Sequence, residues 1–281
     1  GSRSKVRKLG SAAKRKLRTA SARLGQIGDQ KSADQRTPRI EKVTEIPVDP
    51  KLAVIVPAYN VSQYLEDCVK SIVNQSYTNW EMVIINDGSV DATGSIADQL
   101  ASTDGRITVI HQENRGLGAA RNVGIDRTKA PYMTFIDSDD LIAAEAFSLM
   151  MGSAAESGSD VVIGSIDRFN STRSWVPFWV ELVHDERRLG ITAKELAPVM
   201  WDVFACNKIF KRKTWNEIVG KFPTGTLYED QECTAKLFVN DAKLDIIPET
   251  VYHWRHREDG QSITQQKSNI DDLKQRIRVA K

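Results

Sequence analysis

Cysteine is scarce in this sequence of 281 residues, and its few copies lie far apart: Cys68, Cys206 and Cys233. An odd, scattered set argues against a disulfide framework or a cysteine-rich zinc site, and it favours a reducing compartment. We expect each cysteine to be a small buried residue. No run of eighteen apolar residues occurs, and the basic amino end lacks the apolar core of a signal peptide. These absences predict a cytoplasmic protein.

Acidic residues are missing from positions 1–24, which hold nine Lys or Arg; the first acid is Asp29. Residues 1–50 are therefore predicted to form a basic arm and a polar linker that act separately from the fold. Residues 1–24 are expected to contact an anionic membrane surface, at the inner face of the cell membrane. A solvated helix or a disordered leader is the alternative. Gly1-Ser2 and the missing initiator Met suggest a segment cut from a longer protein.

Strand and helix patterns alternate from Leu52 onward. Ser62 is expected to cap the first helix. Since helices separate the strands, the alternation predicts an α/β fold with a mostly parallel sheet flanked by helices. The expected strands are residues 52–56, 81–85, 107–110 and 132–136.

Polar motifs follow three of these strands, at the sheet edge where such folds bind ligands. They are Pro57-Ala58-Tyr59-Asn60, Asn86-Asp87-Gly88-Ser89 and Asp137-Ser138-Asp139. With Asp140, the third motif places three carboxylates within four residues. Because carboxylates this close repel one another, a divalent cation is expected between them. The alternative is a solvated loop in which Asp139 or Asp140 caps the next helix.

These motifs resemble the family 2 glycosyltransferases of the GT-A fold, of the bacterial surface-polysaccharide or teichoic-acid type. The resemblance is dense over residues 51–165 and resumes at Tyr228-Glu229-Asp230, at residues 252–257 and at Ser262-Ile263-Thr264. It implies a nucleotide-sugar site made of Pro57, Ala58, Tyr59, Asn60, Asp87, Gly116, Arg121, Asp137, Ser138 and Arg257.

Individual roles follow from the resemblance. Asp87 would accept the uracil imide N–H, and Arg121 would lie over the base or near the phosphates. Gly116 and Gly118 would permit close backbone approach. The alternatives are that Asp87 or Asp91 caps the following helix, and that Arg121 is a solvated ion-pair partner.

The Asp-x-Asp motif of the family is matched by Asp137 and Asp139. Asp139 is implied as the main ligand of Mg²⁺ or Mn²⁺, and Asp137 as a contact to ribose or a metal-bound water. Asp230 is implied as the catalytic base with Glu229 as its partner, although both would also complement a helix dipole. Lys208, Arg255 and Arg257 are candidates for contacts with the diphosphate or an anionic acceptor.

The predicted function is inverting, metal-dependent transfer of a hexosyl or N-acetylhexosaminyl group. The sugar moves from a UDP-sugar to a hydroxyl of a cell-surface polysaccharide, polyol-phosphate or teichoic-acid-like acceptor. The alternatives are a nucleotidyltransferase and a non-catalytic nucleotide-sugar-binding module; nucleic acid is not an expected partner. The absence of a Gly-x-Gly-x-x-Gly turn after the first strand disfavours an oxidoreductase.

Residues 51–165 are expected to form the nucleotide-sugar-binding half, and residues 166–265 the acceptor half with the base. Residues 165–184 are rich in Trp, Phe and Arg, which suits stacking on sugar rings or an ordinary loop packed on the core. His253 and His256 would face opposite sides of a strand, so no His metal site is expected there. Residues 266–281 are predicted to form a helix that leads to a further module.

Overall fold

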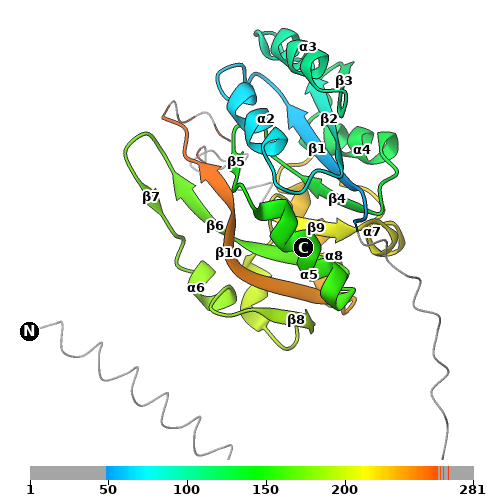
Figure 1. Cartoon of the computed structure of the whole chain (residues 1–281), viewed down its shortest axis with the longest axis vertical. Helices are drawn as coiled ribbons and strands as arrows, with labels where there is room; N and C mark the ends of the chain where they lie inside the picture. The colour runs from blue at the N-terminus through cyan, green and yellow to red at the C-terminus, as the bar shows by residue number, and fades with distance from the viewer. Residues whose placement is uncertain (1–48, 259, 261, 263–264, 266–281) are drawn as a thin grey trace, which may run out of the picture. The chain divides into compact units, whose positions relative to one another are not determined.

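A single mixed sheet organises the residues described by the computed structural model, which are 49–258, 260, 262 and 265 (Figure 1). The predicted basic arm and the predicted helix 266–281 lie outside the described residues. No helix in the described part of the chain is long and apolar enough to cross a membrane. The predicted division of the domain into two halves at residue 165 stays a prediction.

Ten strands are hydrogen-bonded into this sheet within the described residues. They are β1 (Leu52–Ala58), β2 (Trp80–Asp87), β3 (Ile107–Gln112), β4 (Tyr132–Phe135), β5 (Leu141–Ile142), β6 (Val161–Phe169), β7 (Ser174–Trp175), β8 (Arg188–Ile191), β9 (Lys208–Lys211) and β10 (Leu244–Arg255). The helices are α2 (Leu65–Val73), α3 (Thr93–Thr103), α4 (Leu117–Arg127), α5 (Ala146–Ser157), α6 (Val180–Val183), the 3₁₀ helix η1 (Ala197–Trp201), α7 (Arg212–Ile218) and α8 (Glu229–Val239).

The first four strands confirm the predicted alternation, with β2 and β4 on either side of β1 and β3 beyond β2, all in parallel pairs. Every residue of β1 is buried, which explains its unbroken apolar run. The predicted cap at Ser62 is wrong. Helix α2 starts at Leu65 without a side-chain cap, and the Ser62 amide donates instead to Asp91 (3.1 Å).

The second half of the sheet differs from the expected parallel arrangement because β9 is inserted between β4 and β6, antiparallel to both. Two consecutive antiparallel pairings restore the direction, so β6 runs parallel to β4 and pairs with β10 in parallel. The carboxyl ends of β1, β2, β4, β6 and β10 therefore meet at one edge of the sheet, together with the amino end of β9. This edge carries the candidate site.

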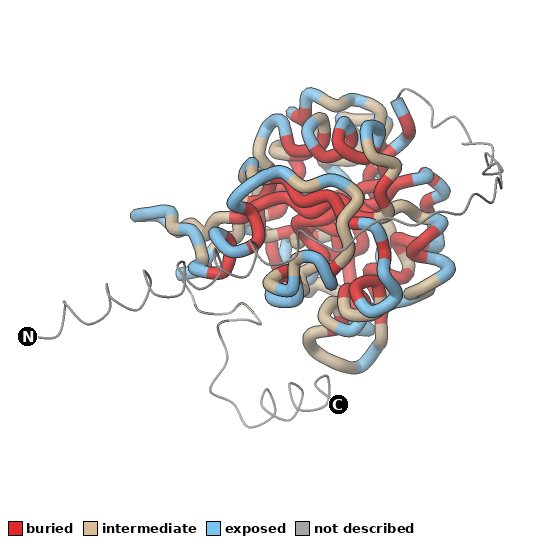
Figure 2. Tube along the Cα trace, turned by 90° about the horizontal axis from the view of Figure 1, so that it is seen from below, coloured by how far each residue is buried: buried red, intermediate tan, exposed pale blue. Residues whose placement is uncertain are grey.

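The core lies between this sheet and the helices that cover it, and Figure 2 shows the buried residues concentrated along the central strands. All three cysteines are buried and free, as predicted. Helix α4 packs on β1 and β2, and α5 packs on β6 and β10. At Gly124 of α4 the approach is so close that a Cβ atom would lie 2.4 Å from Cγ2 of Ile55. Only glycine lets α4 lie this close to β1.

We therefore predict that Gly124→Ala lowers the free energy of unfolding by about 1–3 kcal/mol, because the added methyl group overpacks the interface between α4 and β1. Gly152→Ala is the matched control. Gly152 is also helical, but a Cβ there would meet nothing within 4 Å, so this change should stabilise the protein by up to about 1 kcal/mol. Urea unfolding followed by tryptophan fluorescence measures both, and equal effects would contradict the packing argument.

Candidate active site

The loops after β1 and β2 are tied to each other at the site edge. The Asn60 amide donates to the Ser89 hydroxyl (3.1 Å), and the Asn60 side chain accepts from the Val90 amide (2.9 Å). Asn60 takes a positive φ of 50° to make this turn. Tyr59 is half exposed, whereas Pro57 and Ala58 are buried in the last positions of β1 rather than in a turn. Tyr59 is thus the member of this motif that offers an open aromatic face.

Asp87 anchors the loop that leads into α4. Its buried carboxylate accepts hydrogen bonds from the Arg115 amide (3.0 Å), the Gly116 amide (2.9 Å) and the Gln112 side chain (2.6 Å). The alternative that Asp87 caps the next helix is wrong, because the Thr93 amide donates to Asp91 instead (2.9 Å).

Gly116 and Gly118, beside this loop, are each required to be glycine for a different structural reason. Gly116 has a φ of 85°, which disfavours other residues. Gly118 has an ordinary backbone conformation, but a Cβ there would lie 2.2 Å from the carbonyl oxygen of Pro223. The group that approaches Gly118 closely is therefore the Pro223 carbonyl of the protein itself.

Arg121 lies buried between two acidic groups, with 2% of its side chain exposed. Its guanidinium donates to Asp137 (2.7 Å) after β4 and to Glu229 (2.5 Å) at the start of α8. Burial alone would lower the pKa of Arg121, but the carboxylates of Asp137 and Glu229 raise it, so the group stays charged. The solvated alternative for Arg121 is wrong. The Arg121 side chain joins the Asp-x-Asp motif to the Glu229-Asp230 pair, which holds the predicted catalytic base.

The three carboxylates after β4 separate into two kinds. Asp137 and Asp139 are partly exposed, and Asp139 is ion-paired with Arg257 (2.7 Å). Asp140 is buried and accepts from the Tyr252 hydroxyl (2.6 Å) and the Arg255 amide (2.7 Å). Burial raises the pKa of Asp140 well above its ordinary value, and the charges of Asp139 and Asp137 raise it further.

The helix-cap alternative for Asp139 and Asp140 is wrong, because β5 follows directly and α5 begins only at Ala146. Ser138, between the two partly exposed acids, is itself buried. Asp140 therefore holds the acidic loop against β10, while Asp137 and Asp139 remain at the site.

A divalent cation fits Asp137 and Asp139 as an open site. Each carboxylate has one oxygen in an ion pair with an arginine, and the second oxygen lies outside that pair. Hard oxygen donors suit Mg²⁺ or Mn²⁺. Among residues 49–258, 260, 262 and 265, no group of three His, Cys, Asp or Glu residues could enclose a metal. The remaining ligands would therefore come from the bound diphosphate and water.

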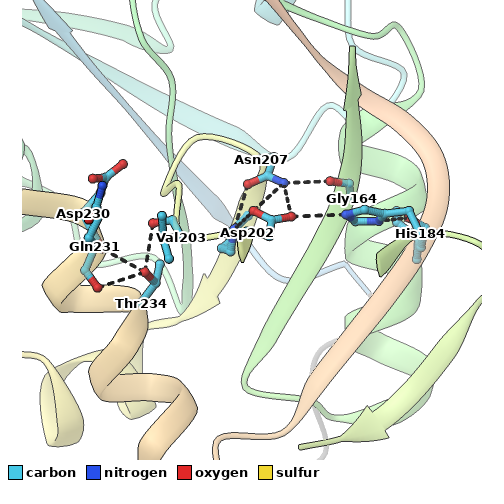
Figure 3. A network of polar contacts seen from close by, with 10 residues as sticks. Gly164, His184, Asp202, Val203, Asn207, Asp230, Gln231 and Thr234 are labelled. Carbon is cyan, nitrogen blue, oxygen red and sulfur yellow. Dashed lines mark hydrogen bonds and ion pairs between the residues drawn. The ribbon is translucent and has the colours of Figure 1, made fainter. Parts of the chain in front are cut away.

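The predicted catalytic acids, Glu229 and Asp230, begin α8 directly after Tyr228, whose φ is 63°. Glu229 is buried against Arg121; burial raises its pKa to about 7, although Arg121 opposes this shift. Asp230 is only partly exposed, and burial raises its pKa as well. Figure 3 shows its carboxylate pointing away from the Thr234 hydroxyl, which bonds the Asp230 carbonyl (3.0 Å). The two acids thus differ: the Glu229 carboxylate is held in an ion pair with Arg121, whereas the bond from Thr234 engages only the main chain of Asp230.

A buried polar network beside β9 overturns one predicted contact. Lys208 is 1% exposed and donates to Asp202, so it cannot reach a diphosphate. Asp202 also contacts His184 (3.2 Å) and Asn207 (2.9 Å) (Figure 3). Burial alone would raise the pKa of Asp202, but Lys208 and His184 lower it. Sequence reasoning missed this network, because Asp202 and His184 lie in no recognisable motif.

The remaining cations and histidines lie around the acidic loop. Arg255 donates through Nε to the Asp139 carbonyl (2.7 Å), and Arg257 pairs with the Asp139 carboxylate. His253 instead contacts Asp167 (2.7 Å), while His256 lies against Trp175. Both arginines therefore lie where a diphosphate bound at Asp139 would meet them.

Comparison with known proteins identifies relatives of this arrangement. Residues 53–218 match the family described as Glycosyl transferase family 2. Glycosyltransferase GlyA of Streptococcus pneumoniae serotype 4 is 34% identical over 218 residues, covering 75% of this chain and 31% of that protein. GlyG of the same organism is 31% identical and covers 73% of this chain and 71% of its own length. The putative glycosyltransferase EpsH of Bacillus subtilis is 31% identical, with 73% of this chain and 61% of EpsH covered. The chain thus spans about a third of GlyA and under two thirds of EpsH.

Two solved structures share the fold. S. aureus TarS 1–349, in complex with UDP-GlcNAc, has a TM-score of 0.69 and 24% identity, and the likeness covers 82% of this chain and 65% of that one. The mannosyltransferase PcManGT from Pyrobaculum calidifontis, in complex with GDP-Man and Mn²⁺, has a TM-score of 0.61 and 22% identity, with 77% and 60% covered. These likenesses confirm the predicted GT-A architecture.

We predict that Arg121→Gln lowers the free energy of unfolding by about 3–5 kcal/mol, because it leaves Asp137 and Glu229 without their shared cation. Adding Glu229→Gln should recover part of this loss by removing one unpaired acid. Arg187→Gln is the control, since Arg187 pairs with Glu156 on the surface, where both side chains are about half exposed; its effect should stay below about 1 kcal/mol. Denaturant unfolding measures all three, and similar losses in both single variants would refute the role of Arg121.

Proposed function

The chain belongs to glycosyl transferase family 2, and on this premise we propose that it transfers a sugar from a UDP-sugar to a hydroxyl group of a cell-surface polysaccharide or teichoic-acid-like acceptor. The observation that carries the proposal is the buried Arg121, which holds the Asp-x-Asp motif beside the Glu229-Asp230 pair. A leaving-group site and a proton acceptor side by side are what group transfer to a hydroxyl requires.

The donor proposed is a UDP-hexose or UDP-N-acetylhexosamine. TarS has been solved with UDP-GlcNAc and with UDP, which supports a uridine nucleotide, although PcManGT binds GDP-Man. Tyr59 offers an aromatic face at the site edge, and Oδ2 of Asp87 accepts a single hydrogen bond from the described residues, that of the Gly116 amide. That oxygen has capacity for one more donor, and the imide N–H of uracil is suited to it.

Asp139 and Asp137 are proposed to hold Mg²⁺ or Mn²⁺. When bound, the ion would neutralise charge on the diphosphate leaving group. Arg257, already paired with Asp139, and Arg255 beside it add positive charge at the same place. Guanidinium groups match phosphate oxygens in geometry, so these two side chains would orient the diphosphate.

Asp230 is proposed as the general base, with Glu229 as a positioning residue. Glu229 is committed to Arg121, so Asp230 is the acid free to accept the proton of the acceptor hydroxyl. Burial raises the pKa of Asp230 toward the operating pH, as a general base requires. With one base and no second nucleophilic carboxylate assigned, direct attack of the acceptor oxygen would invert the anomeric carbon.

The acceptor and location are proposed from the relatives and from charge. One relative of Bacillus subtilis, 44% identical over 92 residues, is named a putative teichuronic acid biosynthesis glycosyltransferase, TuaG. Nine basic residues within positions 1–24, outside the described part, suit an anionic surface. We propose a cytoplasmic enzyme held at the inner face of the cell membrane.

A screen for UDP release across nucleotide sugars tests the function, and Asp230→Asn tests its mechanism. The substitution keeps the shape of the side chain but removes its basicity, so kcat should fall about 10²- to 10⁴-fold while the affinity for UDP stays unchanged. Glu232→Gln is the control, because Glu232 lies in the same first turn of α8 but is exposed and paired with Lys236. If both variants lose stability equally and retain kcat, these acids serve the helix dipole and Asp230 is not the base.

The metal proposal predicts that chelation abolishes UDP release and that Mn²⁺ or Mg²⁺ restores it in the wild type but not in Asp139→Asn. Calorimetry should show that metal strengthens UDP binding to the wild type only, since the variant lacks the main ligand. Asp98→Asn changes an exposed carboxylate that contacts His111, so it should behave as the wild type. Full activity of Asp139→Asn in chelator would remove the metal from the mechanism.

A further inference from the structure

A pocket of about 370 Å³ opens at the carboxyl ends of β6 and β10, beside the acidic loop. Its lining includes Arg168 of β6 and Trp254, Arg255 and His256 of the β10 segment. The volume is within the range of ligand sites. The pocket lies on strands of the predicted acceptor half, whereas Asp137 and Asp139 follow β4. It is therefore a second concave surface next to the donor carboxylates.

Arg168 is the centre of a row of side chains across three strands. It is paired in register with Trp254 on β10 and with Trp175 on β7. Residues directly opposite each other on neighbouring strands project to the same face of the sheet. The guanidinium carbon lies 4.4 Å from the Trp254 ring centroid. The Arg168 row, as we name Trp175, Arg168 and Trp254, thus stacks a cation on the Trp254 ring and has a second tryptophan in register on the other side.

The guanidinium of Arg168 forms no ion pair with the residues that the structure describes. The charge of Asp140 acts on it, but the Asp140 carboxylate is bonded to the Tyr252 hydroxyl and the Arg255 amide. The Nε atom of Arg168 is buried without a hydrogen bond in the described part of the chain. Arg255 and Arg257, by contrast, are each paired with an aspartate. A buried donor without a partner is unfavourable. An incoming oxyanion would accept hydrogen bonds from the part of the guanidinium that lines the pocket, and two of its oxygens match the fork of the guanidinium.

The surroundings of the row favour a carbohydrate that carries charge. Arg173 stacks on Trp175 (5.0 Å), and His256 lies against the same ring (6.0 Å between centroids). Flat aromatic faces suit the apolar faces of sugar rings, and the cations suit an anion next to them. A neutral glycan would offer the Arg168 guanidinium no charged partner.

We propose that the Arg168 row binds an oxyanion of the acceptor, either the phosphate of a polyol-phosphate chain or the carboxylate of an acidic sugar. The adjacent sugar or polyol carbons pack against Trp254, the indole that lines the pocket. Arg255 lines the pocket and also bonds the Asp139 carbonyl, so an acceptor held there lies next to the donor site. This inference rests on the proposed transferase function and assigns the charge class of its acceptor.

The test measures binding of three oligomers of similar length to the full chain by calorimetry: a glycerol-phosphate oligomer, a uronic-acid oligomer and a neutral glucan. We expect one anionic oligomer to bind at least tenfold more tightly than the glucan, and which one it is identifies the oxyanion. Arg168→Gln should weaken that binding about tenfold, and Arg168→Lys should weaken it less. The surface variant Arg187→Gln should leave it unchanged. UDP affinity should be the same in all four proteins.

Equal binding of the three oligomers, or equal affinity of Arg168→Gln and wild type for the anionic one, would overturn the inference. A parallel loss of UDP affinity in Arg168→Gln would also overturn it, by assigning the pocket to the donor diphosphate. Should Arg168→Gln not fold, the inference is tested by the affinity of Arg168→Lys for the anionic oligomer and by the comparison of the three oligomers on the wild type. If no nucleotide sugar releases UDP but oligomer binding still requires Arg168, the transferase proposal fails while the anion site stands.

Discussion

A charged arginine removed from water is the constraint on which this site depends. Arg121 contributes one cation to two carboxylates that come from different parts of the chain, Asp137 after β4 and Glu229 at the start of α8. Taking these charges out of water is costly, and their mutual attraction offsets the cost only while the geometry is kept. The contact between Arg121 and Glu229 bridges 108 positions of sequence. The site therefore exists only when both parts of the chain are folded against each other.

The sheet provides the frame for this contact. Strand β9 runs against its neighbours β4 and β6, so that β6 and β10 end at the same edge as β1, β2 and β4. The antiparallel strand also brings Asn207 and Lys208 to that edge, where they are buried with Asp202. One insertion in the strand order thus places the proposed acceptor residues and the donor residues on a common surface.

The sequence predicted the local parts of this molecule better than its contacts. Apolar runs and polar strand ends located β1 to β4, the family motifs located the acidic loop, and membership of the glycosyltransferase family is confirmed. The errors concern side chains whose partners are distant in sequence. Ser62, Asp140 and Lys208 each fit a plausible local role, but Asp91, Tyr252 and Asp202 determine what they do. Arg121 was selected by motif, yet its burial between two acids depends on packing that no local pattern encodes. The roles of Asp139 and Asp230 stay predictions.

Asp87 fixes its loop through the main-chain amides of Arg115 and Gly116. These hydrogen bonds fix the backbone of the loop, and they do not depend on which side chains the loop carries. The exposed side chains of Glu113, Asn114 and Arg115 take no part in these bonds, so their replacement by other side chains leaves the bonds in place. A loop organised in this way separates the shape of its backbone from the chemistry of its surface, and side chains beside the proposed nucleotide site can be exchanged without rebuilding that site.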